Sequence, residues 1–206
     1  MLNNVTVFDF ETTGLSASED RVIEMAAIRI RNGEIVGSFQ TIVHQPMELS
    51  EKITEITGIT PELMRSGMDE TTAFRILMRF MSEDALLVAH NAAFDLAFLH
   101  HSLQRIAGRT FDNRFIDTLT ISRDRHAYPH KLENMTARYG IKLEGAHRAL
   151  NDVMGCWELL KEFHAEQSID GYVNVLGYLN KYGPPAWVPA HATLRGQNNR
   201  YERGSA

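Results

Sequence analysis

Cysteine and long apolar runs are what this sequence has least of. Cys156 is the sole cysteine in 206 residues, so the chain cannot form an intramolecular disulfide. This excludes a disulfide-stapled secreted scaffold and favours a reducing compartment. No run of about 18 apolar residues is present, and the N-terminus lacks the basic and apolar segments of a signal peptide. We therefore expect a cytoplasmic protein with no membrane span.

Basic residues are also in the minority. The chain has 21 Lys+Arg against 26 Asp+Glu, a net charge of −5, which by itself argues against a partner rich in phosphate. With 44% hydrophobic and 23% charged residues, the composition is that of a globular protein. A chain of this length buries roughly 70% of its extended surface, so its core requires no disulfide or metal.

The order of the predicted elements indicates the fold class. Three strands come first, at residues 4–11, 21–30 and 34–43, and the turn Asn32-Gly33 joins the last two. The later elements are two short helices after Ser50 separated by Gly58 and Pro61, a helix from Asp69, a strand at 85–90, a helix at 93–107 ended by Gly108, a strand end at 115–119, and helices at 131–140 and 148–164. Strands followed by alternating strands and helices predict a three-layer α/β domain with a mixed sheet. We expect this domain to span residues 1–165, followed by a partly irregular C-terminal strap or tail at residues 166–206.

Four acidic residues lie at positions where burying a carboxylate costs free energy. Asp9 and Glu11 are two apart at the end of a largely buried strand, so both side chains leave the same face. On the helical wheel, Asp95 lies within about 60° of Phe98, and Asp152 lies within about 40° of three apolar residues of its own helix. Plain alternatives are a solvated strand end for the first pair and contact with free N–H groups of the helix start for Asp95. No Lys or Arg shares the two helix faces, so we favour a site of oxygen ligands for Mg²⁺ or Mn²⁺.

A convergent carboxylate site of this kind supports chemistry at phosphorus. Two divalent ions about 4 Å apart activate a water and stabilise the leaving oxygen of an in-line displacement. His147 precedes Asp152 by five residues, and a histidine beside such a site is the usual acceptor of a proton from water. Taken alone, His147 would be interpreted as an ordinary surface or core histidine, and it gains this role only beside the carboxylate site.

Three segments carry a resemblance to a known family. They are VFDFETTGL (7–15), HNAAFD (90–95) and HRALND (147–152), supported by RVIEMAAI, ITGIT, FIDTL and KLENMTARYGI. In order and separation they resemble the three motifs of the DEDDh (DnaQ-like) 3′–5′ exonucleases, the family of the epsilon proofreading subunit of bacterial DNA polymerase III and its stand-alone relatives. The alternative subgroup has Tyr four residues before Asp152, where this chain has Arg148. The resemblance covers roughly residues 4–165.

The resemblance implies an RNase H-like fold with a mixed five-stranded sheet flanked by helices. It also implies two divalent cations and hydrolysis of phosphodiester bonds at the 3′ ends of single-stranded DNA or RNA, with release of nucleoside 5′-monophosphates. By motif, Asp9 bridges both ions, Glu11 and Asp152 hold the ion that activates water, and Asp95 helps to hold the second ion. His147 is then the general base.

The same resemblance implies contacts to the substrate. Thr12, Thr13 and Gly14 match the turn whose main chain meets the terminal nucleotide, and Leu15 matches an apolar wedge against the last base. A plain core leucine is the alternative for Leu15. The remaining expected contacts are Thr57, where the proofreading subunit often has His, and His90, Asn91 and Phe94, which shape the pocket. Asn91 alternatively caps the helix that follows it.

Two questions of function stay open at this level. The chain is an exonuclease acting alone, or an interaction subunit whose main role is association with a DNA polymerase, with the tail as tether. Choice between DNA and RNA requires a residue that tests the 2′-hydroxyl, and the sequence identifies none.

Two bound divalent ions would change the net charge from −5 to −1, and residues 105–148 hold nine Lys+Arg against five acids. That segment is a candidate for backbone contacts or a mixed solvated surface, and we expect weak nucleic-acid binding without metal.

Overall fold

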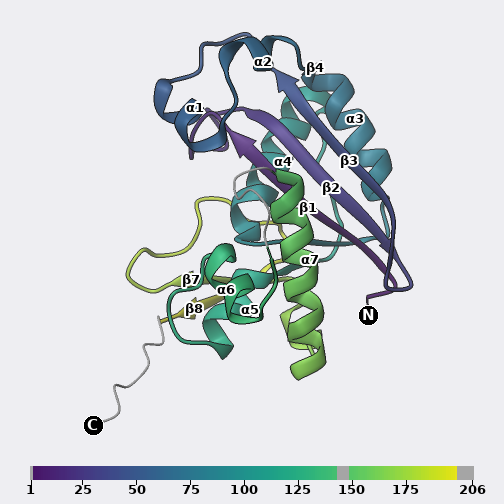
Figure 1. Ribbon diagram of the computed structural model, residues 1–206, viewed down its shortest axis with the longest axis vertical. Coiled ribbons are helices and arrows are strands. Elements are labelled where there is room, and N and C mark those ends of the chain that lie inside the picture. The colour runs from purple at the N-terminus through teal and green to yellow at the C-terminus, as the bar shows by residue number, and fades with distance from the viewer. Residues whose placement is uncertain (1, 143–148, 199–206) are drawn as a thin grey trace.

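A mixed sheet of six strands forms the centre of the computed structural model, which describes residues 2–142 and 149–198 (Figure 1). The strands are β1 (Asn4–Thr12), β2 (Val22–Arg31), β3 (Glu34–His44), β4 (Met68–Asp69), β5 (Leu86–Ala89) and β6 (Phe115–Asp117), in the order β4-β3-β2-β1-β5-β6. β1, β2 and β3 pair antiparallel, whereas β5 pairs parallel with β1 and β6. The predicted α/β class and mixed sheet are confirmed. The sixth strand is β4, whose two residues are too few to show a sequence period.

Helices connect and cover the strands. They are α1 (Glu51–Thr57), α2 (Pro61–Arg65), α3 (Glu70–Met81), α4 (Ala92–Ala107), α5 (Thr118–Arg125), α6 (Leu132–Arg138) and α7 (Ala149–Glu166). α1 and α3 begin where Ser50 and Asp69 predict, and Thr60 caps α2 in the same way, because all three side chains accept hydrogen bonds from first-turn N–H groups. No helix within residues 2–142 and 149–198 is long and apolar enough to cross a membrane.

Two apolar clusters lie on opposite faces of the sheet and make three layers. Phe8 and Phe10 of β1 pack with Phe74 of α3 and the apolar side of α4 on one face. Val5 and Val7 of β1 pack with α7 on the other face. Because side chains alternate along a strand, the pleat directs Asp9 to the face of Val5 and Val7, toward α7.

The C-terminal segment adds a small parallel sheet of β7 (Val175–Leu179) and β8 (Thr193–Gln197). β7 coincides with the strand-like pattern in the sequence, whereas β8 has no such pattern. The pair docks on α5, because the Gly177 N–H donates to Thr120 Oγ1 at 2.7 Å and Gln197 Nε2 donates to the Thr120 carbonyl at 2.9 Å. Between the two strands, Trp187 packs against the core and stacks on His100 with ring centroids 4.2 Å apart.

Candidate active site

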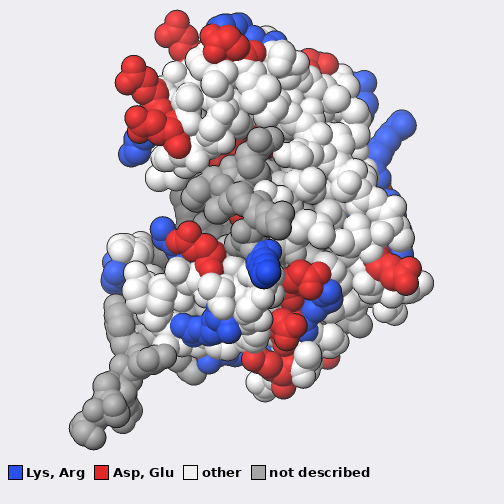
Figure 2. All heavy atoms as spheres, viewed as in Figure 1, with Lys and Arg blue, Asp and Glu red and all other residues white. Residues whose placement is uncertain are grey.

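Three carboxylates meet where β1 ends beside α7. Asp9 and Glu11 project from one face of β1, and Asp152 lies in the first turn of α7. One oxygen from each of the three lies within 4.8 Å of the oxygens from the other two. Figure 2 shows a few acidic atoms near the centre of this face of the molecule. The geometry therefore brings together residues 143 positions apart in sequence, as the apolar faces of the strand and the helix predict.

Asp95 approaches the same end of β1 from α4. Its side chain is 2% exposed, and Oδ1 accepts a hydrogen bond of 3.1 Å from the backbone N–H of Phe10, which lies between Asp9 and Glu11. The inward direction expected from the helical wheel is therefore observed. A β1 amide, rather than solvent, is its partner. This bond fixes Asp95 against the strand that carries the first two carboxylates.

Burial and mutual repulsion disturb the ionisation of the cluster. Burial raises the pKa of Asp9 well above its usual range, and the charges of Asp95, Glu11 and Asp152 add to the effect. Burial raises the pKa of Glu11 to about 7, with further contributions from Asp152 and Glu24. Burial also raises the pKa of Asp95, although the Phe10 N–H opposes the rise. No Lys or Arg among the described residues offsets these shifts at Asp9 or Glu11, so a bound divalent cation fits the donor set.

Glu24 is a fifth acid that reasoning from sequence missed. It lies on β2 directly opposite Glu11, is 1% exposed, and accepts a hydrogen bond of 2.7 Å from Gln40 Nε2. A glutamate within the apolar run VIEMAAI is the signal that could have drawn attention to it. Its place beside Glu11 follows from strand register, which the sequence alone does not fix.

Comparison with known proteins identifies the family of the chain that carries this carboxylate cluster. The family model described as "Exonuclease" matches residues 6–160. The chain belongs to the exonuclease family. It is also 38% identical over 199 residues to the PolC-type DNA polymerase III of Latilactobacillus sakei, and 34% identical over 202 residues to that of Listeria monocytogenes. Each alignment covers 93% of this chain and 14% of the relative, so the chain spans about one seventh of these polymerases.

Solved structures confirm the RNase H-like fold of this exonuclease. E. coli exonuclease I in complex with a dA16 oligonucleotide superposes with a TM-score of 0.70 at 21% identity, over 80% of this chain and 41% of that one. Exonuclease X in complex with 5′-overhanging duplex DNA gives a TM-score of 0.64 at 21% identity, over 79% and 92% of the two chains. The family match and the PolC-type relatives confirm the resemblance to the DnaQ-like exonucleases.

The turn after β1 in this exonuclease is held by Asp20. Its carboxylate accepts hydrogen bonds from Thr13 Oγ1 at 2.9 Å and from the Ser16 N–H at 2.9 Å, and Thr12 Oγ1 donates to the Gly14 carbonyl at 2.6 Å. At the tip of this turn Leu15 is 87% exposed, so the alternative of a core leucine is wrong. Leu15, Asn91 and Phe94 line a cavity of about 330 Å³ with Trp187. An apolar side chain held in solvent beside a cavity is available to a ligand.

The other expected substrate contacts, and the expected general base, do not lie together in the structure. His90 and Asn91 line a further cavity of about 580 Å³, described below. Thr57 instead is buried at the end of α1, where its hydroxyl donates to the Ile53 carbonyl at 2.8 Å, so the structure does not bring it to either cavity. His147 lies outside the described residues.

Asp117, and not the side chain of Asn91, caps the start of α4. Asn91 has a left-handed backbone, with φ of 72°, and its side chain makes no capping bond. Asp117 Oδ1 accepts hydrogen bonds from the N–H groups of Asn91 at 2.9 Å and Ala92 at 3.1 Å, and the same carboxylate caps α5 through Leu119 and Thr120. One buried acid thereby aligns α4, which carries Asp95, with α5. The segment FIDTL contains this residue, but its partners at the start of α4 are distant in sequence.

Proposed function

We propose that this exonuclease hydrolyses phosphodiester bonds at the 3′ ends of single-stranded DNA or RNA and releases nucleoside 5′-monophosphates. The observation that supports this most is the cluster of the partly buried Asp9, Glu11 and Asp152 with the buried Asp95, without a described Lys or Arg to offset the charge at Asp9 and Glu11. Two divalent cations, Mg²⁺ or Mn²⁺, would supply the positive charge and activate the water. Single-stranded substrate agrees with the oligonucleotide complexes known for exonuclease I.

The roles proposed for the acidic side chains are those that the family motifs imply, and the placement of the side chains is compatible with them. Asp9, whose nearest charged neighbours are the other acids, is proposed to contact both ions, and Glu11 and Asp152 would hold the ion on the side of the attacking water. Asp95, fixed to the Phe10 N–H, is proposed to help hold the second ion. His147 is proposed to accept the proton of the attacking water, since a histidine titrates near neutral pH.

The turn of Thr12, Thr13 and Gly14 is proposed to hold the terminal nucleotide. Asp20 orders this turn, and the exposed side chain of Leu15 is then available to pack against the last base. Phe94 and Asn91 line the cavity next to Leu15 and are proposed to shape the pocket for this nucleotide. Thr57 carries no role in this proposal, because its hydroxyl is bonded within α1.

A polymerase-associated proofreading function is the second candidate. It is favoured by the similarity of 93% of the chain to PolC-type DNA polymerase III. In this arrangement residues 1–165 are the proposed catalytic domain and residues 166–206 the proposed connection to a polymerase, in the cytoplasm. Stable co-purification of the chain with a replicative polymerase would support it, and retention of that partner after deletion of the tail would exclude the tail as the connection.

A direct assay tests the proposed reaction. 5′-Labelled single-stranded DNA, single-stranded RNA and a mismatched duplex end are incubated with the protein in Mg²⁺ or Mn²⁺, and the products are resolved as a ladder. We expect shortening from the 3′ end by single nucleotides, lost in Asp9→Ala. Inactivity of the wild-type chain on all three substrates with both metals would overturn the proposal.

A further inference from the structure

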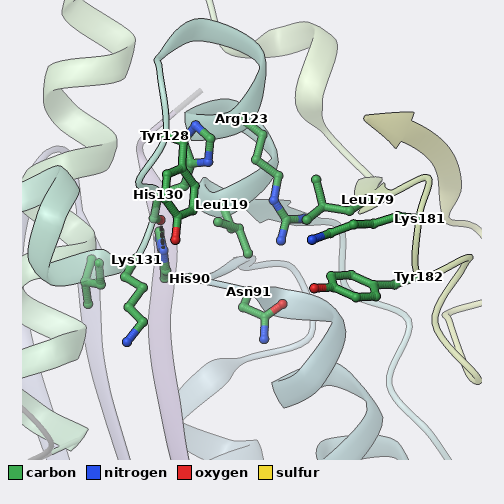
Figure 3. Close-up of a pocket in the computed structure, with 11 residues that line it drawn as sticks. His90, Asn91, Leu119, Arg123, Tyr128, His130, Lys131, Leu179, Lys181 and Tyr182 are labelled. Carbon is green, nitrogen blue, oxygen red and sulfur yellow. Dashed lines mark hydrogen bonds between the residues drawn. The ribbon is translucent and has the colours of Figure 1, made fainter. Parts of the chain in front are cut away.

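A second cavity shares Asn91 with the cavity beneath Leu15. Its volume is about 580 Å³, within the usual range of ligand sites. Part of its wall comes from His90 and Asn91, which precede α4, and from α5, and part comes from the turn after β7, which supplies Lys181 and Tyr182 (Figure 3). The family match ends at residue 160, so the C-terminal segment builds part of this cavity outside the matched region.

Three basic side chains lie in the wall of this cavity, one of which, Lys131, also lies 3.9 Å from Glu133 Oε1 outside the wall. Arg123, Lys131 and Lys181 line it, and none of the described residues lining it is Asp or Glu. Figure 3 shows the guanidinium of Arg123 and the ammonium of Lys181 pointing into the cavity from α5 and from the turn after β7. Cations that converge on one concave space favour an anion there, and a phosphodiester group meets that requirement.

Two tyrosines stand beside these cations in solvent. Tyr182 is 75% exposed and Tyr128 is 54% exposed, although both rings line the same cavity. Lys181 Nζ lies 4.4 Å from the centroid of the Tyr182 ring, so charge and aromatic surface occur together. Exposed aromatic rings next to Lys and Arg are the surface that binds single strands, since bases stack on the rings while phosphates meet the cations.

The cavity is anchored to the frame of the candidate active site. The carbonyl of Gly177 in β7 accepts a hydrogen bond of 3.3 Å from Arg123 Nη1, and the Gly177 N–H donates to Thr120 Oγ1. Thr120 Oγ1 donates in turn to Asp117 Oδ2 at 2.6 Å, and Asp117 also holds the start of α4. The cationic wall and the helix that carries Asp95 therefore share one buried anchor.

We propose that this cavity is a second nucleotide subsite, which binds phosphate and base of the single strand on the 5′ side of the scissile bond. The proposal rests on the proposed 3′–5′ exonuclease function. A terminal nucleotide held beside Leu15 has no neighbour on its 3′ side, so a cavity adjoining through Asn91 can receive only nucleotides that precede it. Arg123 and Lys181 contact the phosphate, and Tyr182 stacks on a base. DNA and RNA share this chemistry.

Two substrates of different length test the subsite. The p-nitrophenyl ester of thymidine 5′-monophosphate carries no nucleotide on the 5′ side of its scissile bond, whereas the oligonucleotide dT10 places nucleotides there that can reach the second cavity. We expect Lys181→Ala combined with Tyr182→Ala to lower the ratio of kcat/KM on dT10 to kcat/KM on the ester by about tenfold. Tyr182→Phe, which keeps the ring, and Lys52→Ala on the exposed side of α1 are the matched controls and should leave the ratio unchanged. An unchanged ratio in the double variant would overturn the subsite.

A binding measurement separates this inference from the proposed function. In an Asp9→Asn background, fluorescence anisotropy of labelled dT10 reports binding without hydrolysis. We expect the double variant to weaken binding about tenfold, and Lys181→Ala alone to reduce the slope of log affinity against log salt by about 0.7, the value for one phosphate contact on a single strand. Equal binding by Asp9→Asn with and without the double variant would refute the subsite. A wild-type chain inactive on both substrates would refute the exonuclease function instead.

Discussion

Glu11 is expected to destabilise the metal-free protein at neutral pH, and Glu11→Gln to relieve that cost. Burial and the neighbouring acids raise its pKa from 4.5 to about 7. An acid whose pKa is higher in the folded state than in the unfolded state lowers the free energy of unfolding when it is ionised. For Glu11 this loss is absent below pH 4.5, grows as the pH rises from 4.5 to 7, and is complete above pH 7. At about 1.4 kcal/mol per pKa unit, Glu11→Gln should gain at most about 3 kcal/mol at pH 8 and nothing at pH 4.

Thermal unfolding in the presence of EDTA measures this effect. For a chain of this size, about 1 kcal/mol shifts Tm by about 2–4 °C, so the variant should melt up to about 10 °C higher at pH 8. Glu55→Gln, on the exposed face of α1, is the control and should leave Tm unchanged at both pH values. Added Mg²⁺ should stabilise the wild type more than Glu11→Gln, because the variant lacks a proposed ligand. Equal Tm values for wild type and variant at pH 8, or the same gain at pH 4, would refute the reasoning.

Four further outcomes follow from the described contacts. Leu15→Ala should lower kcat/KM on oligonucleotides several-fold and change the free energy of unfolding by less than about 0.5 kcal/mol, since the side chain is 87% exposed; a large loss of stability in urea would contradict its free position. Asp117→Ala should cost about 3 kcal/mol or more in urea unfolding, because several buried N–H groups lose their acceptor; a loss below about 1 kcal/mol would show that α4 and α5 are held otherwise. Trp187→Ala should lower Tm by removing the stack on His100, and unchanged melting would show that the strap is not part of the cooperative fold. Calorimetric Mg²⁺ affinity should rise from pH 6 to pH 8 with proton release, because the pKa of Glu11 is about 7; affinity independent of pH would argue against protonated ligands.

Local periodicity explains which parts of the site the sequence predicts. The side on which Asp9, Glu11, Asp95 and Asp152 leave their elements depends only on the two-residue repeat of a strand and the 3.6-residue repeat of a helix. Those repeats lie within a few neighbouring residues, so a single segment reveals them. The observed meeting of Asp9, Glu11 and Asp152 agrees with that reasoning.

Features that depend on distant pairing escape sequence analysis for the same reason. Glu24 enters the acidic cluster through the register of β2 against β1, and Asp117 reaches α4 across 26 residues of chain. β4 and β8 are short strands without a recognisable sequence pattern, and only their pairing with β3 and β7 identifies them as strands. The partner of Thr57 is another such feature, because a motif match does not show that its hydroxyl donates to the Ile53 carbonyl of its own helix.

The distribution of charge, rather than the net value of −5, governs what this molecule can bind. Carboxylates occupy the ends of β1, α4 and α7, whereas Arg123, Lys131 and Lys181 line the adjoining cavity. A strand that reaches both regions is attracted at the cavity and repelled at the carboxylates until divalent cations offset their charge. Metal should therefore strengthen binding through the scissile phosphate, and Lys181→Ala should weaken binding with or without metal. If the two regions act independently, the free energies of the two effects on dT10 binding add; strong non-additivity would show that metal also repositions the turn after β7.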